Sequence, residues 1–282
     1  LTSMDAEGCE AFLCELMLQP ESTRYRIDCA RLGYVSPFGM LVCSYAIAAF
    51  RERHPQCELE LVNHERHTYA AHMGFFRALG ADFGRAPGEA SGSSSYVPVT
   101  LLSVASIREL ARRDMVRVQS WLEREAGRLA GLLVQGATYE VRRVLVFAIT
   151  EMLRNIVEHS EAEQLGYCAQ YWPSRDIVEV AILDSGVGIA ASLSRNPWLE
   201  IESEEHALHL ALLPGVSGVA FRGAHRDRHD EWANAGFGLY MASSICREAG
   251  SFLIASGNSS LELEGHEKRA RRLPMNGTAV RM

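Results

Sequence analysis

The sequence contains a single lysine. Lys268 is one of 28 basic residues in a chain of 282, and all the others are arginine. A Walker-type phosphate-binding loop needs a lysine between a glycine and a serine or threonine, because that lysine neutralises the β- and γ-phosphates. Lys268 lies instead between Glu267 and Arg269. The sequence therefore excludes Walker-type NTPases, and also kinases of the protein-kinase fold, which need a lysine on a strand.

Long apolar runs are absent as well. The longest, such as residues 39–50, are far shorter than the ~20 residues that a membrane-spanning helix needs. The first residues, Leu1–Asp5, carry neither the basic region nor the apolar core of a signal peptide. We expect neither a membrane protein nor a secreted one, and place the protein in the cytoplasm.

The cysteines follow no pairing pattern. There are seven, scattered along the chain and never spaced as C-x-x-C, so we expect free thiols that pack as small apolar residues. The histidines lack the spacing of a zinc site. A net charge of -7 also argues against nucleic-acid binding, which calls for a basic face.

Composition divides the chain into two predicted domains. Residues 85–95 are rich in small residues and carry proline and glycine, which is typical of a linker or exposed loop. We predict an N-terminal domain over residues 1–90, a linker over 91–98 and a C-terminal domain over 99–282.

The fold class follows from the expected helices and strands. In the N-terminal domain, strands alternate with helices, which predicts a small βαβα unit with a mostly parallel sheet. In the C-terminal domain, helices followed by paired strands predict an α/β two-layer sandwich, with helices on one face of a mixed, mainly antiparallel sheet. The expected helices are 5–18, 40–52, 69–79, 104–119 continuing to 133, 138–160 and 237–248, and the expected strands are 25–29, 57–62, 166–172, 177–183, 252–256, 260–264 and 277–281.

The helix at 138–160 carries the first candidate site. Its apolar residues recur at helical spacing and form one core stripe, with His159 inside it as a packed or capping residue. Glu151 and Asn155 are four apart, so they share the margin of that stripe. An acid beside an amide oxygen can hold Mg²⁺ and activate a water or hydroxyl. A flanking polar pair is the alternative.

Three glycine-containing segments follow. Asp184-Ser-Gly-Val-Gly188 ends a buried strand, so its carboxylate can accept from an exocyclic amine while Gly186 and Gly188 allow a sharp turn. Asn234-Ala-Gly-Phe-Gly-Leu239 opens a helix, and amides at a helix start can bind phosphate without lysine. Asn276-Gly-Thr278 opens the last strand, where Thr278 can donate to a ligand. Each segment alone is also an ordinary turn.

In combination, the four segments resemble the Bergerat ATP-binding fold that gyrase, chaperone, mismatch-repair and histidine-kinase ATPases share (the GHKL superfamily). The resemblance covers about residues 100–282. Glu151–Asn155 resembles the N box and Asp184–Gly188 the first glycine box, Gly236–Gly238 resembles the second, and Gly277-Thr278 the third.

The resemblance implies ATP and Mg²⁺ as cofactors and assigns a role to each segment. Glu151 would be the general base or the acid that positions water, Asn155 the Mg²⁺ ligand and Asp184 the carboxylate that recognises adenine. Residues 190–235 would form the ATP lid, with three arginines as candidates to reach phosphate or as a solvated loop. The implied nucleotide-binding residues are Asn155, Asp184, Gly186, Gly188, Gly236, Phe237, Gly238, Leu239 and Thr278, and the lid arginines are Arg222, Arg226 and Arg228.

Two further features indicate which kind of GHKL protein the chain resembles. No histidine lies between His72 and His159, which argues against an autophosphorylating histidine kinase, and the Glu151/Asn155/His159 spacing most resembles the anti-sigma-factor serine kinases. Residues 22–85 resemble a STAS domain, the fold of the anti-sigma-factor antagonists. In that family the turn before the helix carries a phosphorylated serine, but here Pro37 and Phe38 occupy the hydroxyl positions, with Ser36 at the aspartate. Ser36 is the acceptor in the alternative in which this loop is one residue longer.

We therefore expect a regulatory protein that binds Mg-ATP and either hydrolyses it slowly or transfers its γ-phosphate to a protein serine or threonine. The lid would couple the nucleotide state to a protein partner, regulatory or STAS-like. The alternatives are an ATP-gated binding module without chemistry and an ATP-dependent dimerising clamp, so a homodimer stays open.

Overall fold

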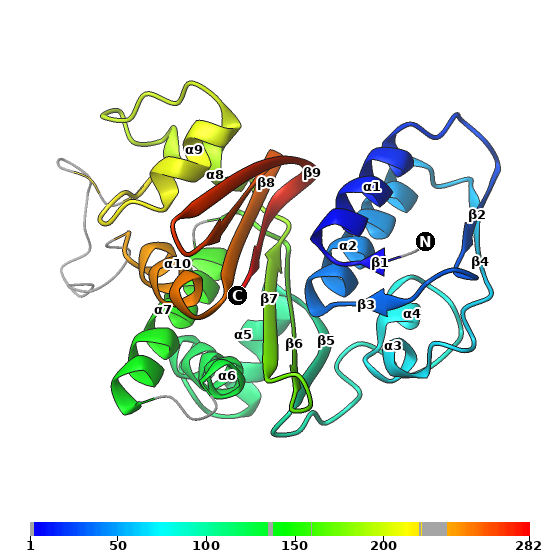
Figure 1. The fold of residues 1–282 in the computed structure, drawn as a ribbon, viewed down its shortest axis with the longest axis horizontal. Helices are drawn as coiled ribbons and strands as arrows, with labels where there is room; N and C mark the ends of the chain where they lie inside the picture. Colours follow the sequence, from blue (N-terminus) through cyan, green and yellow to red (C-terminus); the bar gives the residue numbers. More distant parts are fainter. Residues whose placement is uncertain (1–2, 135–137, 159, 220, 222–235) are drawn as a thin grey trace. The chain divides into compact units, whose positions relative to one another are not determined.

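The structure, a computed structural model, describes residues 3–134, 138–158, 160–219, 221 and 236–282. It is a mixed α/β protein (Figure 1). In chain order its elements are β1 (Ser3–Met4), α1 (Ala6–Met17), β2 (Arg24–Asp28), β3 (Tyr34–Val35), α2 (Pro37–Arg53), β4 (Glu58–Val62), α3 (Thr68–His72), α4 (Phe75–Ala78), β5 (Tyr96–Ser103), α5 (Val104–Arg113), α6 (Val118–Leu133), α7 (Tyr139–Glu158), β6 (Gln164–Trp172), β7 (Ile177–Asp184), α8 (Gly188–Leu193), α9 (Glu204–Ala211), α10 (Gly238–Ala249), β8 (Ser251–Glu264) and β9 (Glu267–Arg281).

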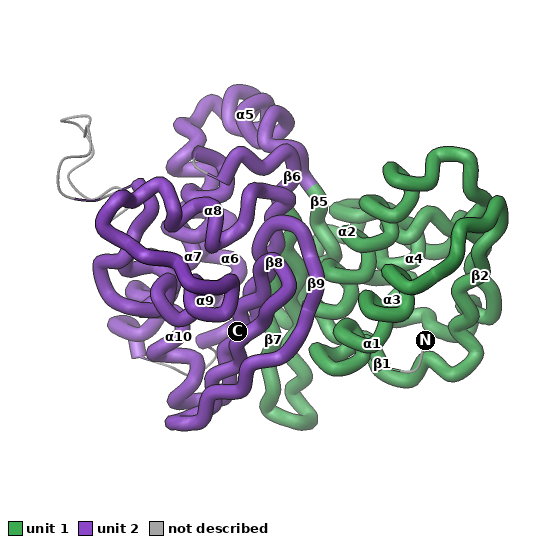
Figure 2. The backbone as a smooth tube through the Cα atoms, turned by 90° about the horizontal axis from the view of Figure 1, so that it is seen from above, with its two compact units in different colours: residues 1–101, 166–182 green, residues 102–165, 183–282 purple. Residues whose placement is uncertain are grey.

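The chain divides into two compact units, which Figure 2 colours separately. Unit 1 comprises residues 1–101 and 166–182, and unit 2 comprises residues 102–165 and 183–282. The described strands form a parallel β1-β3 pair, a parallel β2-β4 pair and a five-stranded sheet in the order β5-β6-β7-β9-β8. The parallel pairing of β2 and β4 agrees with the expectation for the N-terminal segment.

In unit 1, α2 begins earlier than the sequence suggests. The residues expected to form a turn, Pro37 to Gly39, are its first turn instead. Proline suits this position because its amide would lack a partner there in any case. Ser36 is the N-cap: its side chain accepts a hydrogen bond from Gly39 N at 3.1 Å, and the residue is only 1% exposed. Its hydroxyl is therefore a structural cap and is shielded from solvent.

The segment expected to be a linker is hydrogen-bonded within unit 1. Arg85 N donates to Ala71 O at 3.0 Å, and Gly88 N donates to Val99 O at 2.8 Å. Ala90 is buried, and β5 already starts at Tyr96.

Unit 2 stacks helices on the strand pair β8-β9. Helix α6 packs on α7, α7 on α10, and α10 on β8, so these amphipathic helices contact one another in turn and α10 contacts the strand pair (Figure 1). β8 and β9 pair antiparallel along their length, with register shifts between Ser256 and Ser259. The shifts mark a bulge, which increases twist and redirects side chains locally.

Four expected boundaries were wrong, each for a local reason. The helix expected over 104–133 is split into α5 and α6, with Met115 at a positive φ of 56° between them. The helix expected over 69–79 is split into α3 and α4 at Gly74, which has φ 91°. The two strands expected over 252–264 are one bulged strand, β8, and the strand expected over 277–281 is the end of the longer β9.

Two sequence expectations about composition can be compared with the structure. All seven cysteines are free thiols, as expected. Four of them, Cys9, Cys29, Cys43 and Cys168, are buried like apolar residues, whereas the other three are partly exposed. Over the described ranges, no helix combines the length and apolarity that crossing a bilayer requires.

The contact between α2 and β1 yields the first prediction. A Cβ at Gly39 would lie 1.9 Å from the carbonyl oxygen of Met4. We expect Gly39→Ala to lower the free energy of unfolding by about 1–3 kcal/mol, because the backbone of β1 would have to move away. Urea denaturation of the full chain, followed by circular dichroism, measures this.

Gly127→Ala is the matched control. A Cβ at Gly127, inside α6, meets nothing within 4 Å, so alanine should raise stability by up to about 1 kcal/mol through helix propensity. Equal effects of the two substitutions would contradict the close approach of α2 to β1.

Candidate functional site

Helix α7 places Glu151 and Asn155 on two sides of a burial boundary. The helix packs an apolar face into the core because its apolar residues recur every three or four positions. Glu151 is only 6% exposed, whereas Asn155, one turn later, is exposed. The buried apolar residues of this helix are Leu145, Ala148, Ile149, Met152, Leu153, Ile156 and Val157.

A residue that the sequence analysis missed, Arg154, holds the Glu151 carboxylate. Its Nη2 lies 2.7 Å from Glu151 Oε1 and 2.8 Å from Oε2. The Arg154 side chain is only 9% exposed and that of Glu151 only 7%. Within the described residues, Arg154 Nε has no hydrogen-bond partner. The i, i+3 spacing of these two residues was a readable signal for the pair.

The second predicted segment begins at the buried end of β7. Asp184 is 5% exposed, and its Oδ1 accepts a hydrogen bond from Gly186 N at 2.7 Å. The side chain and backbone of Thr278 also donate to it. Burial raises the pKa of the Asp184 carboxyl to about 6, while these hydrogen bonds act in the opposite direction.

Close backbone contacts join this turn to the start of the last predicted strand. A Cβ at Gly277, which has φ 82°, would lie 2.0 Å from Asp184 O. Ser256 Oγ on β8 donates to Gly277 O at 2.8 Å and accepts from Ile189 N at 2.9 Å. A Cβ at Gly188 would lie 2.7 Å from the same hydroxyl. The first and third glycine segments are therefore in direct contact.

Ser160 connects this glycine turn to α7. Its amide donates to Asn155 O at 2.9 Å, and its carbonyl accepts from Val187 N at 3.0 Å. A Cβ at Gly186 would lie 2.3 Å from that carbonyl oxygen. The end of the helix that carries Asn155 thus rests directly on the turn that follows Asp184.

The remaining segment meets α7 at Glu151. A Cβ at Gly238, the first residue of α10, would lie 2.8 Å from Glu151 Cβ and 3.4 Å from Ala148 O. Gly236 has φ 69°, and a Cβ there would lie 2.3 Å from Val216 O. The first turn of α10 itself carries no acidic side chain, and it is the positive end of the helix dipole.

Residues 190–219 contain a folded part of the predicted lid. Helices α8 and α9 share a small apolar cluster built on Leu193, Ala207 and Ala211, against which Leu239 of α10 packs. Glu204 fastens this cluster to the β8 bulge, because its Oε2 accepts from Asn258 N at 2.5 Å. Phe237 is 41% exposed. The predicted His159, Arg222, Arg226, Arg228 and Asn234 lie outside the described residues.

The arrangement fits a magnesium nucleotide chemically. Asp184 offers a buried acceptor for an amine, and Asn155 offers an exposed amide oxygen, a ligand type that Mg²⁺ accepts. Gly186, Gly188 and Gly277 line a cavity of about 410 Å³ beside Asp184. Over the described ranges, no group of three or more His, Cys, Asp or Glu side chains is placed to hold a metal on its own, so a phosphate would have to share the ion.

No protein-family model matches this sequence, and no curated protein matches it. A function for this site therefore has to be argued from the sequence motifs and from the geometry described above.

The buried Asp184 yields a prediction about pH. Its native pKa of about 6 lies above the 3.8 of an exposed carboxyl, so between these values the folded chain binds more protons than the unfolded chain. Stability from this group should fall as pH rises from about 4 to about 6 and then level off. At ~1.4 kcal/mol per pKa unit, the change is up to about 3 kcal/mol.

Asp184→Asn removes this titration and is the comparison that isolates it. Urea denaturation at several pH values should show the variant gaining stability relative to wild type between about pH 4 and pH 6. A constant difference between the two proteins across that range would rule out the raised pKa.

The Glu151–Arg154 pair yields a prediction about stability. Arg154→Met leaves a carboxylate buried without its partner, and we expect a loss of about 3–5 kcal/mol in the free energy of unfolding. Adding Glu151→Gln should recover part of that loss, because no charge then stays buried alone. Urea denaturation of the single and double variants tests this.

Arg24→Met serves as the surface control. Arg24 and Glu58 form an ion pair at 2.8 Å, but their side chains are 67% and 65% exposed, so the loss should stay below about 1 kcal/mol. A similar loss in both arginine variants would mean that burial does not strengthen the Glu151–Arg154 pair.

Proposed function

We propose that this protein binds Mg-ATP with a GHKL-type domain in its C-terminal part and acts as a regulatory ATPase or protein serine/threonine kinase. The observation that carries the proposal is the convergence of four segments that are distant in sequence. Gly238 packs on Glu151, Gly277 packs on Asp184, and Ser160 joins α7 to the Gly186 turn.

Each segment offers one part of a nucleotide site. The Asp184 carboxylate is suited to accept from the exocyclic amine of adenine, beside Thr278. The start of α10 at Gly238 is suited to receive phosphate, because its amides and dipole attract an anion. Asn155 is suited to hold Mg²⁺, which would offset charge on the phosphates when bound.

Glu151 lies beside the proposed phosphate site and would act as the base. The proton of the attacking water or serine hydroxyl passes to a Glu151 oxygen. The attacking oxygen forms a bond to the γ-phosphorus, and the bond from that phosphorus to the bridging oxygen breaks, releasing ADP.

The N-terminal part would serve regulation as a STAS-like domain. The parallel β2-β4 pair and the apolar α2 support that assignment. The buried cap role of Ser36 argues against this serine as a phosphate acceptor, so the acceptor would be on a protein partner. The cluster of α8 and α9 would couple nucleotide binding to that partner.

A second candidate is an ATP-gated binding module without turnover. The observation that favours it is the ion pair of Arg154 with both oxygens of Glu151. A carboxylate in an ion pair accepts a proton less readily, and a base that accepts no proton would not support turnover. Phosphate release distinguishes the two candidates.

The testing experiment is calorimetric titration of ATP with Mg²⁺, with phosphate release followed in the same samples. Asp184→Asn should weaken ATP binding at least tenfold, because it replaces the acceptor for the adenine amine with a group that also donates. Glu151→Gln should leave binding and lower phosphate release by about 100-fold or more.

Asp176→Asn and Glu140→Gln are the controls, since both residues are exposed and neither lies in the four segments. Unchanged slow release in Glu151→Gln would favour the binding module. Dimers that appear on light scattering only with ATP would favour a dimerising clamp. Absence of ATP binding to wild type would refute the proposed function.

A further inference from the structure

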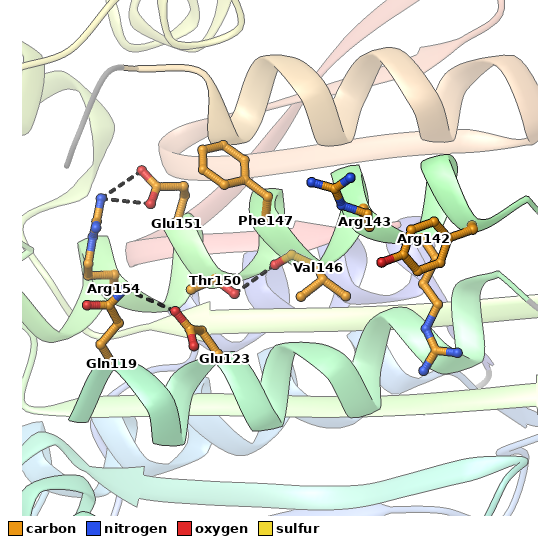
Figure 3. A pocket seen from close by; sticks show the side chains of 10 residues that line it. Gln119, Glu123, Arg142, Arg143, Val146, Phe147, Thr150, Glu151 and Arg154 are labelled. Atoms are coloured by element: carbon orange, nitrogen blue, oxygen red, sulfur yellow. Dashed lines mark hydrogen bonds and ion pairs between the residues drawn. The ribbon is translucent and has the colours of Figure 1, made fainter. Parts of the chain in front are cut away.

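A cavity of about 440 Å³ lies between α6 and α7 and reaches Glu151 (Figure 3). This volume falls within the range of ligand sites, about 300–1,000 Å³. Figure 3 shows Arg142 and Arg143 at one end and Glu151 with Arg154 at the other. Gly238 approaches the Glu151 side chain from α10, whereas this cavity is bordered by α6 and α7.

The arginine end of the cavity is positively charged and exposed. Arg142 and Arg143 are both exposed, and neither forms an ion pair within the part of the chain that the structure describes. Arg143 lies over the ring of Tyr139, 5.8 Å from its centroid. Glu123 of α6 is the carboxylate on the cavity wall besides Glu151, and it accepts from Gln119 at 3.0 Å.

Exposed aromatic rings accompany these arginines. Tyr139 is 70% exposed and Phe147 is 36% exposed, and both line the cavity. Tyrosine and arginine together are the residue types that dominate binding energy at protein interfaces. The composition of the cavity therefore suits a protein segment that carries carboxylates.

We propose that this cavity binds the acceptor segment of the protein substrate: an extended, acidic segment whose serine or threonine lies at Glu151 and whose carboxylates lie at Arg142 and Arg143. This inference rests on the proposed function, because it uses Glu151 as the base. In-line transfer requires the nucleophile and the leaving group on opposite sides of the phosphorus. An acceptor segment that enters between α6 and α7 meets this requirement, because the phosphates of ATP would bind on the other side of Glu151, at the start of α10.

The helix geometry fixes the spacing in that segment. Residues 142–143 and 151 are eight or nine positions apart on α7, which is about 12–14 Å along the axis at 1.5 Å per residue. An extended chain covers about 3.3–3.6 Å per residue. The acidic residues should therefore lie about four positions from the acceptor hydroxyl.

A second copy of this chain fits the cavity less well. A twofold interface places the same patch on both sides, so a contact whose axis passes through Arg142 and Arg143 would bring these arginines against their own counterparts. Like charges at an interface are unfavourable, whereas an acidic segment neutralises them.

The probe is a fluorescent serine peptide with pairs of glutamates four and five positions from the serine on both sides. Anisotropy titration with the full chain should show binding that weakens with salt. Arg142→Glu with Arg143→Glu should weaken it at least tenfold, and Arg142→Lys with Arg143→Lys should keep most of it. A matching thermal unfolding midpoint shows that the charge-reversed variant is folded.

Arg175→Glu with Arg272→Glu is the matched control, because it changes the net charge equally at exposed residues outside the cavity and should bind like wild type. Equal binding of a lysine peptide, equal binding by the charge-reversed variant, or no binding at all overturns the proposal. A wild-type dimer that the charge reversal disperses also overturns it, in favour of a second copy.

The ATP titration separates the two levels of inference. Peptide binding without ATP binding refutes the proposed function but leaves an acidic-segment site. ATP binding without peptide binding refutes only this assignment of the cavity. When both bind, transfer of labelled phosphate to the serine should be weakened by the charge reversal as the peptide affinity is.

Discussion

Backbone groups can surround the buried carboxylate of Asp184 only because glycine stands at the points of contact. Gly277 lies against the Asp184 carbonyl, and Gly186 supplies an amide to the carboxylate itself. A side chain at Gly277 would clash with the Asp184 carbonyl, and one at Gly186 would clash with the Ser160 carbonyl. Either shift would cost the carboxylate donors that offset part of its desolvation. The rest of the site follows from this contact, because Ser160 and Ser256 attach the helix and the next strand to the same turn.

Much of this arrangement could be predicted from the sequence because it depends on local patterns. The periodicity of α7, the strand ending at Asp184 and the glycine-opened α10 all agree with their expected ranges within one or two residues. Each has a period or a backbone requirement that acts within a few residues. For the same reason, the four segments of the candidate site could be predicted from the sequence, whereas the contacts between them could not.

What the sequence could not provide comes from tertiary packing. Ser160 and Ser256 are ordinary serines in the sequence, and only the meeting of distant backbones makes them bridges. The splits at Met115 and Gly74 lie inside segments whose helical periodicity continues across them. Arg154 could have been found from its i, i+3 spacing to Glu151. Its burial, however, depends on the helices that pack against α7.

Ser256 has a consequence for motion. A hydroxyl has one proton, and donating it to Gly277 O fixes the rotor that also presents a lone pair to Ile189 N. The Gly277 segment of β9 and the first turn of α8 are therefore both tied to the side-chain torsion of Ser256. In hydrogen exchange with solvent, the Ile189 amide should open together with the Gly277 segment, as a single cooperative unit rather than as two independent segments.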